Sequence, residues 1–489
     1  MPHRSSPSSI SADSGPRPRT DSAEEVDGAD SLRQTLRTQI RRRLRQRNGH
    51  EEARGVEAIT SVSVQVPGEV RPLNWLRAQP TGEALYWSGR DDDVEIAAMG
   101  AADRIGTSDL PVDVSALEER LDRRLERGSG VRYFGGLRFD AEQPAAASSP
   151  DDRWRPFGAA RFVLPRFLLR RTPAGTALTC RLVLPRDHGR REALEQAIDA
   201  LVFPRAQAPA SLPPLLERTD APSHARWKQM VEWALRHFDG GALHKVVLAR
   251  RVALRFARRI GPFHVLQHLR DATHGCFHFA VRPAAPAAWI GASPERLFRR
   301  TGSTVVSEAV AGTRSRGDSA QADAALRDEL MQSPKDRREH AFVEDAIRDR
   351  LQSLCTSVEV DEETSEMELE RGRHLHSQVR GTLRPTATSL DVLAALHPTP
   401  AVGGVPHRRA LTAIRRKEPF DRGWYAGPVG WIGTDEAEFA VAIRAGLVRG
   451  DAIDLFSGAG LVAGSEPDAE WDEIEQKIGD FAAVLGIGD

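Results

Sequence analysis

Long apolar runs are missing from this sequence, cysteines are few, and charge of either sign is not in excess. No segment approaches the roughly 20 apolar residues of a membrane-spanning helix, so we expect no integral membrane segment. The N-terminus also lacks the apolar core of a signal peptide. The net charge of −1 provides no overall field to recruit nucleic acid, and we expect no nucleic-acid partner. Three widely spaced cysteines, Cys180, Cys276 and Cys355, favour no disulfide framework and fit a reducing, cytoplasmic compartment.

The chain is long enough for two or three domains or for one large one, and its 40% hydrophobic content is that of a globular protein. Residues 1–30 are rich in Ser, Pro, Arg and Asp, which predicts disorder. Residues 32–47 place an aliphatic residue at every fourth position among many arginines, which predicts a short basic amphipathic helix. That helix could be solvated, or it could dock on the chain itself, on an anionic membrane surface or on nucleic acid. We therefore expect residues 1–55 to be an N-terminal extension of a domain over 56–489.

From residue 56 onward, short β-like runs alternate with helical patterns. The proline-rich stretch 204–222 is the best candidate for an internal linker. After it, a helix over 226–238 ends at two glycines, and an apolar strand follows that carries Lys245 on its inward face. A buried lysine has a pKa that falls readily, which would make it a usable base. The alternative is a lysine that reaches solvent at the edge of the sheet.

The stretch 456–477 contains the densest pattern, with three glycines before a helix start marked by Ser465 and Pro467. Glu470 and Glu473 lie one above the other on that helix. Two carboxylates beside a glycine-rich turn suit a hard cation such as Mg²⁺, which takes oxygen ligands. The alternative is a solvated acidic face.

Two further turns carry polar groups. Glu295 follows a Ser-Pro pair in a tight turn, directly before a strand. Glu308 lies on a strand that ends in the turn Ala311, Gly312 and Thr313, whose backbone N–H groups and hydroxyl suit a carboxylate ligand.

These segments together resemble a known family. In chain order they read HKVVLAR, GASPERL, EAVAGTRSRG, SPKDRREHAFVEDAI, RHLHS, HPTPAVGG, WYAGPVGW, AIRAG and GAGLVAGSEPDAEWDEIEQK. The set resembles the chorismate-utilising enzymes, and the isochorismate synthases most, over about residues 225–481. A preceding half of this size, with Trp and Tyr, resembles the members of the menaquinone pathway. The resemblance implies one α+β domain, in which two stacked antiparallel sheets have helices packed outside, and overrules the expectation of several domains.

The resemblance also implies roles for particular residues. Lys245 matches the general base that activates water, and Glu295 matches the general acid that protonates the departing hydroxyl. The positions that match the Mg²⁺ site are Glu339, Glu470 and Glu473. The positions that match the substrate site are Gly312, Thr313, His374, Ala401, Tyr425, Arg444 and Gly460. His340, His376 and Glu308 are interpreted as structural.

Three positions separate the members of the family. Lys245 is the lysine that ammonia-using anthranilate synthases lack. Ala311 stands where some aminodeoxychorismate synthases carry a nucleophilic lysine, so we expect no covalent intermediate. Ala401 stands where salicylate synthases tend to carry threonine, which favours isochorismate as the product.

The leading hypothesis is therefore a Mg²⁺-dependent isochorismate synthase that acts on chorismate for menaquinone, as a monomer or homodimer. The alternatives are an isochorismate synthase of a siderophore pathway, a salicylate synthase that releases pyruvate, and a non-catalytic chorismate-binding protein.

Overall fold

The computed structural model describes residues 21–45, 57–80, 82–91, 93–125, 130–143, 153–204, 208, 210–370 and 372–487. Within them, strands and helices alternate along the chain, and every strand pairing is antiparallel. None of the helices in this part of the chain is long and apolar enough to cross a membrane.

The strand β5 (Ala160–Thr172) is the point at which the sheet branches. Along one edge it pairs with β3 (Glu95–Thr107) over nearly its whole length. Along the other edge its first half pairs with β4 (Tyr133–Leu137) and its second half with β6 (Gly175–Leu184). Two long arms of the sheet start from opposite edges of β5, at β3 and at β4, and the sheet forks because β6, which shares an edge with β4, leads instead to β1 (Ala58–Gln65).

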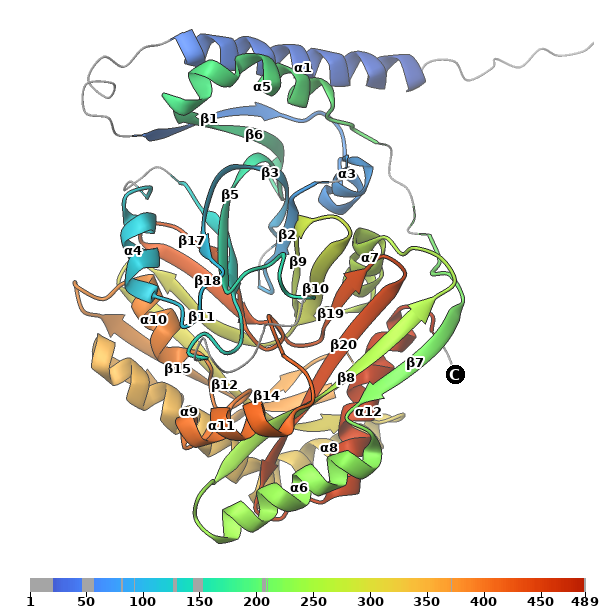
Figure 1. The fold of residues 1–489 in the computed structure, drawn as a ribbon, viewed down its shortest axis with the longest axis vertical. Helices are drawn as coiled ribbons and strands as arrows, with labels where there is room; N and C mark the ends of the chain where they lie inside the picture. The colour runs from blue at the N-terminus through green and yellow to red at the C-terminus, as the bar shows by residue number, and fades with distance from the viewer. Residues whose placement is uncertain are drawn as a thin grey trace, which may run out of the picture.

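The first arm runs from β3 to the edge of the molecule near the C-terminal helix (Figure 1). Its strands, in spatial order after β3, are β2 (Ala84–Ser88), β9 (Phe277–Ala284), β10 (Ala287–Ser293), β19 (Ala445–Arg449), β20 (Ala452–Val462) and β8 (Lys245–Phe256), with β7 (Leu215–Ala221) and β16 (Gly404–Val405) on the far edge of β8. The strand β7 lies inside the stretch 204–222, so the linker predicted there is wrong for those residues. It was missed because a polar strand at a sheet edge lacks an apolar pattern.

The second arm starts at β4. Its strands, in spatial order after β4, are β17 (Pro428–Ile432), β18 (Glu436–Val441), β11 (Arg296–Thr301), β12 (Thr304–Ser315) and β15 (Gly372–Leu383), with β13 (Cys355–Val360) and β14 (Ser365–Glu368) on the far edge of β15. The two antiparallel sheets expected from the sequence are therefore confirmed, and they are joined through β5.

Helices lie outside the strands (Figure 1). They are α3 (Pro72–Ala78), α4 (Val114–Asp122), α5 (Arg191–Asp199) after a 3₁₀ turn (Arg186–Arg190), α6 (His224–Asp239), α7 (Pro262–Ala272), α8 (Ala320–Gln332), α9 (Pro334–Leu354), α10 (Ser389–Leu396), α11 (His407–Lys417) and α12 (Pro467–Val484). Two of them carry predicted site residues. The helix α9 begins where Ser333 Oγ accepts from the N–H of Asp336, and both α9 and α12 have a proline in the first turn. Ser465 does not cap α12 as predicted, because its hydroxyl accepts from the N–H of Val462 in the preceding turn.

The N-terminal helix α1 (Asp21–Arg45) lies against α5 and β1 (Ala58–Gln65) at one end of the molecule (Figure 1). Its stripe of Leu32, Leu36 and Ile40 is buried in the same hydrophobic core as the strands. Docking on the chain itself is thus the arrangement that the structure shows. The disorder predicted for residues 21–30 is wrong, whereas residues 1–20 lie outside the described part. Residues 46–56 also lie outside it, so the boundary at residue 55 stays a prediction.

Candidate active site

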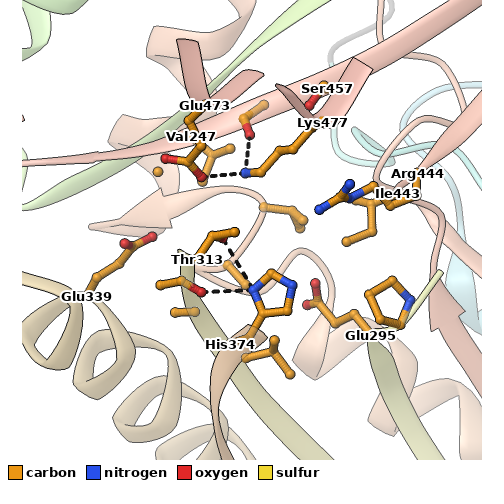
Figure 2. A pocket seen from close by; sticks show the side chains of 18 of the residues that line it. Val247, Glu295, Thr313, Glu339, His374, Ile443, Arg444, Ser457, Glu473 and Lys477 are labelled. Carbon is orange, nitrogen blue, oxygen red and sulfur yellow. Dashed lines mark hydrogen bonds and ion pairs between the residues drawn. The ribbon is translucent and has the colours of Figure 1, made fainter. Parts of the chain in front are cut away.

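The two arms of the sheet face a cavity of about 160 Å³. It is lined by eleven of the twelve site residues predicted from the sequence: Glu295, Gly312, Thr313, Glu339, His374, Ala401, Tyr425, Arg444, Gly460, Glu470 and Glu473. They come from strands of both arms, from α9 and α12, and from four connecting segments, and Figure 2 shows many of them converging. The twelfth, Lys245, reaches the same region from β8.

Lys245 is fully buried, and its ammonium nitrogen lies 3.0 Å from Oε1 of Glu339. The contact is an ion pair whose geometry is not that of a hydrogen bond. Gly460 makes it possible, because a Cβ at position 460 would lie 2.1 Å from the same Glu339 oxygen. The inward orientation expected for Lys245 is therefore present, and the edge position that was the alternative is not.

Glu295 occupies the turn between β10 and β11, where Ser293 Oγ accepts from its backbone N–H at 3.2 Å. The same hydroxyl donates to the carbonyl of Val441 at 2.6 Å, so the turn is fixed to the second arm. Burial raises the pKa of Glu295 to about 8, opposed by Lys245 and reinforced by Glu308. The carboxyl is thus held in its protonated form near neutral pH, as a proton donor must be.

His374 anchors the segment predicted to hold a carboxylate. The prediction that the strand ends there in a turn is wrong, because Ala311, Gly312 and Thr313 lie within β12, where its register with β15 shifts between Ala311 and Arg314. The Nδ1 of His374 lies 2.8 Å from the carbonyl of Gly312 and 3.3 Å from Thr313 Oγ1. Burial, and then the charge of Arg444, lowers the pKa of His374 to about 4, so the ring is neutral at pH 7. A bond to a carbonyl requires the proton on Nδ1, which leaves Nε2 as an acceptor. Gly312 has a φ of +68°, a conformation that favours glycine.

Arg444 and Tyr425 line the same cavity as Gly312 and Thr313. The Tyr425 ring stacks on Phe456 at 5.3 Å between centroids, and Arg444 Nη1 lies 3.8 Å from a carboxylate oxygen of Asp480. Arg444 has a φ of +49°, and the neighbour of Tyr425, Ala426, has a φ of +59°. Among the described residues these two are the non-glycine residues with positive φ. Such conformations cost of the order of 1–3 kcal/mol each and occur often at functional sites.

The three carboxylates of the predicted metal site each contact a lysine. Glu339 pairs with Lys245, Glu470 Oε1 with Lys335 at 2.8 Å, and Glu473 Oε1 with Lys477 at 2.6 Å. Burial and the neighbouring Glu473 raise the pKa of Glu470. Burial would also raise the pKa of Glu473, but Lys477 holds that pKa below its usual range. The described residues contain no group of three or more such side chains close enough to hold a metal as they stand.

The position of Lys335 nevertheless shows that these carboxylates suit a cation. Burial alone would lower the pKa of its ammonium group, yet Glu470, Glu339 and Glu473 together raise it. A positive charge is thus already stabilised by all three carboxylates at once. Oxygen ligands of this kind are the ones that Mg²⁺ prefers, so the residues fit the ion once the lysines give way.

Sequence reasoning gave no role to Lys335 or Lys477, which both line the cavity. Lys477 also donates to the carbonyl of Gly458 at 3.2 Å (Figure 2). A signal for Lys477 was present, since it follows Glu473 by four residues on the same helix face. No local signal pointed to Lys335, whose partner is 135 residues away.

Comparisons with known proteins agree with this site. A family model described as "Chorismate binding enzyme" matches residues 43–486. The chain is 35% identical to isochorismate synthase 2, chloroplastic, of Arabidopsis thaliana, over 87% of this chain and 80% of that protein. It is 30% identical to isochorismate synthase MenF of Bacillus subtilis, over 92% of this chain and 99% of that protein. The solved structure of MenF, the menaquinone-specific isochorismate synthase of Escherichia coli, superposes with a TM-score of 0.79 at 28% identity, covering 92% of this chain and 99% of that one.

Proposed function

Because the chain belongs to the family of chorismate-binding enzymes, we propose that it is an isochorismate synthase, an isomerase that converts chorismate to isochorismate. The observation that carries the proposal is a buried carboxyl group held in its protonated form together with a buried lysine. Glu295 lines the cavity, and Lys245 contacts Glu339, another residue that lines it. A binding protein has no need of a base and an acid around one ligand.

The roles of the two groups follow from their surroundings. With its amine neutral, Lys245 takes a proton from the water that attacks C2 of the ring. The ring electrons shift towards C4, and Glu295 donates a proton to the hydroxyl that leaves there. Figure 2 shows Glu339, the partner of Lys245, and Glu295 at opposite sides of the drawn site. We therefore propose that base and acid approach the ring from different directions, which suits one group arriving while another departs.

The remaining predicted residues hold the substrate. Chorismate carries two carboxylates, and Arg444 offers the planar group that binds a carboxylate through two hydrogen bonds. The N–H groups and hydroxyl of the Gly312 and Thr313 segment supply further donors, as does Tyr425. Lys477 adds a positive charge to the same wall of the cavity.

Mg²⁺ is part of the proposal, since chorismate-utilising enzymes generally depend on it. Glu339, Glu470 and Glu473 would hold the ion, which would neutralise substrate carboxylate charge inside the cavity. Lys335 would then lose its contact with Glu470.

The pathway we favour is that of menaquinone, because similarity to MenF extends over nearly the full length of both chains. We further propose a cytoplasmic enzyme that is a monomer or a homodimer, which fits the free cysteines and the absence of a spanning helix in the described residues.

The deciding experiment is product analysis of the purified protein with chorismate, with and without Mg²⁺ and in the presence of ammonium. We expect isochorismate only with Mg²⁺, without pyruvate and without an aminated product. Salicylate with pyruvate would identify a salicylate synthase and remove Ala401 as a discriminator. Binding without turnover would refute the enzyme proposal.

A further inference from the structure

Arg90 lies in the turn between β2 and β3, about 200 residues before Glu295, yet its guanidinium group reaches the turn that carries Glu295. Its Nη1 donates to the carbonyl oxygen of Pro294 at 2.7 Å. Pro294 immediately precedes Glu295, so this bond holds one of the two peptide groups that flank the acid. We propose that Arg90 is a positioning residue for Glu295, an inference that rests on the proposed function.

The turn around Glu295 is fixed on its other side as well. Ser293 donates to the carbonyl of Val441, and the N–H of Val441 donates to the carbonyl of Glu295 at 3.1 Å. Both of those bonds attach the turn to the end of β18. The bond from Arg90 attaches the carbonyl of Pro294 to the β2–β3 turn, beside a second link in which Arg296, the residue after Glu295, donates to Asp91 of the same turn. Removing the bond from Arg90 frees Pro294 while the rest of the turn stays attached, which changes the orientation of Glu295 more than the fold.

Arg90 also binds Glu308, the carboxylate whose charge adds to burial in raising the pKa of Glu295. The grip is bidentate, with Nη1 to Oε2 at 2.8 Å and Nη2 to Oε1 at 2.6 Å. Arg296 donates to the same Oε1 at 2.6 Å, and the side chain of Glu308 is 1% exposed. Although burial opposes it, His376 and the two arginines hold the pKa of Glu308 at about 2. Arg90 therefore fixes both the backbone of the acid and the fixed charge beside it.

A lysine could not replace this set of contacts. Besides Pro294 and Glu308, the guanidinium uses Nε to donate to Asp91 at 3.0 Å. Four bonds in three directions need the planar fork of arginine, since an ammonium group has three donors on one atom. The sequence indicated only a structural role for Glu308. Through its partner Arg90, Glu308 is also linked to the turn that carries the acid.

Arg90 is accessible for an experiment although its partner Glu308 is buried. It lines a second cavity, of about 580 Å³, on the side away from Glu308. A small cation can therefore enter the space that a truncated side chain leaves. Arg132 offers a matched control, because it makes a similar bidentate contact with Glu436, at 2.7 and 2.8 Å, and neither residue lines the candidate active site.

The test compares Arg90→Ala, Arg90→Lys and Arg132→Ala in the full chain with chorismate and Mg²⁺. We expect Arg90→Ala to lower kcat by about 10- to 100-fold, the effect of a lost charge-assisted contact and a displaced acid, with KM changed by less than about threefold. Guanidinium at a sub-denaturing concentration should raise kcat of Arg90→Ala by at least about fivefold, whereas sodium at equal ionic strength should not raise it. Arg132→Ala should keep the wild-type kcat and show no rescue.

Several outcomes would overturn the inference. An unchanged kcat in folded Arg90→Ala would do so, as would a loss without any guanidinium rescue or an equal loss in Arg132→Ala. If Arg90→Ala does not fold, Arg90→Lys decides, because it keeps the charge but not the fork: a kcat at least about fivefold below wild type supports the inference, and a smaller change refutes it. Failure of the wild-type protein to form isochorismate would instead refute the proposed function.

Discussion

Glu295→Gln should make the protein more stable and nearly inactive at the same time. Glutamine has the shape of the protonated carboxyl group but cannot ionise or donate a proton as an acid. Burial raises the pKa of Glu295 from its ordinary value of 4.5 to about 8. Between these two values the folded protein retains a proton that the unfolded chain releases, so the stability contribution is complete below pH 4.5 and is lost as the pH rises to 8.

The size of the effect follows from the two pKa values. Each unit of difference corresponds to about 1.4 kcal/mol, so the wild type should lose about 1 kcal/mol by pH 5, about 3 kcal/mol by pH 7 and nearly 5 kcal/mol by pH 9, relative to acidic pH. Glu295→Gln does not suffer this loss. Its stability advantage over the wild type should therefore grow by about 4 kcal/mol between pH 5 and pH 9.

Urea unfolding of both proteins at pH 5, 7 and 9, followed by circular dichroism, measures the difference. Glu119→Gln, at an exposed position of α4, is the control, and the difference between its stability and that of the wild type should not change with pH. In the same preparations kcat of Glu295→Gln should fall by about 10²–10⁴-fold, and kcat/KM of the wild type should decrease above about pH 8 as the acid loses its proton. A stability difference that stays constant from pH 5 to 9 would refute the reasoning, because it would mean that Glu295 is ionised in the folded protein.

Lys245→Ala should lower kcat by about 10²–10⁴-fold, because no other described group is placed to act as the base. Lys228→Ala, on the surface of α6, should leave kcat unchanged. A rate near that of the wild type in Lys245→Ala would contradict the assignment. Glu473→Ala should raise the Mg²⁺ concentration needed for half-maximal rate and weaken Mg²⁺ binding by calorimetry, and identical metal titrations would exclude it as a ligand. Leu36→Ala should lower the free energy of unfolding in urea by about 2–5 kcal/mol, since the side chain is fully buried. Gln39→Ala, at an exposed position of the same helix, should change that free energy little. Equal effects of the two substitutions would mean that α1 does not dock.

Much of the site could be predicted from the sequence because its signals are local. The alternation of the strand that carries Lys245 determined which way the lysine points, and the helical spacing of Glu470 and Glu473 placed both on one face. The irregular position of Gly312 in β12 needs a positive φ, which the glycine itself indicates. In each case the neighbours along the chain carry the information.

Other features could not be predicted in this way. The sequence favoured Ser465 as a helix cap, but that hydroxyl binds Val462 in the preceding turn. The polar strand β7 gave no apolar period, and α1 begins earlier than the composition of residues 21–30 suggested. Local patterns compete at such places, and tertiary packing decides between them.

The sequence by itself identified the family and the α+β class, and it named the residues that we propose as the acid, the base and the metal ligands. The tertiary structure decided what surrounds them: the lysine that each carboxylate contacts, the burial that keeps Glu295 protonated, and the grip of Arg90 on the turn beside it. The physical reason is distance. Periodicity and turn chemistry depend on residues a few positions apart, whereas ion pairing and desolvation depend on groups that meet only after the chain has folded, as Arg90 and Pro294 do across 204 positions.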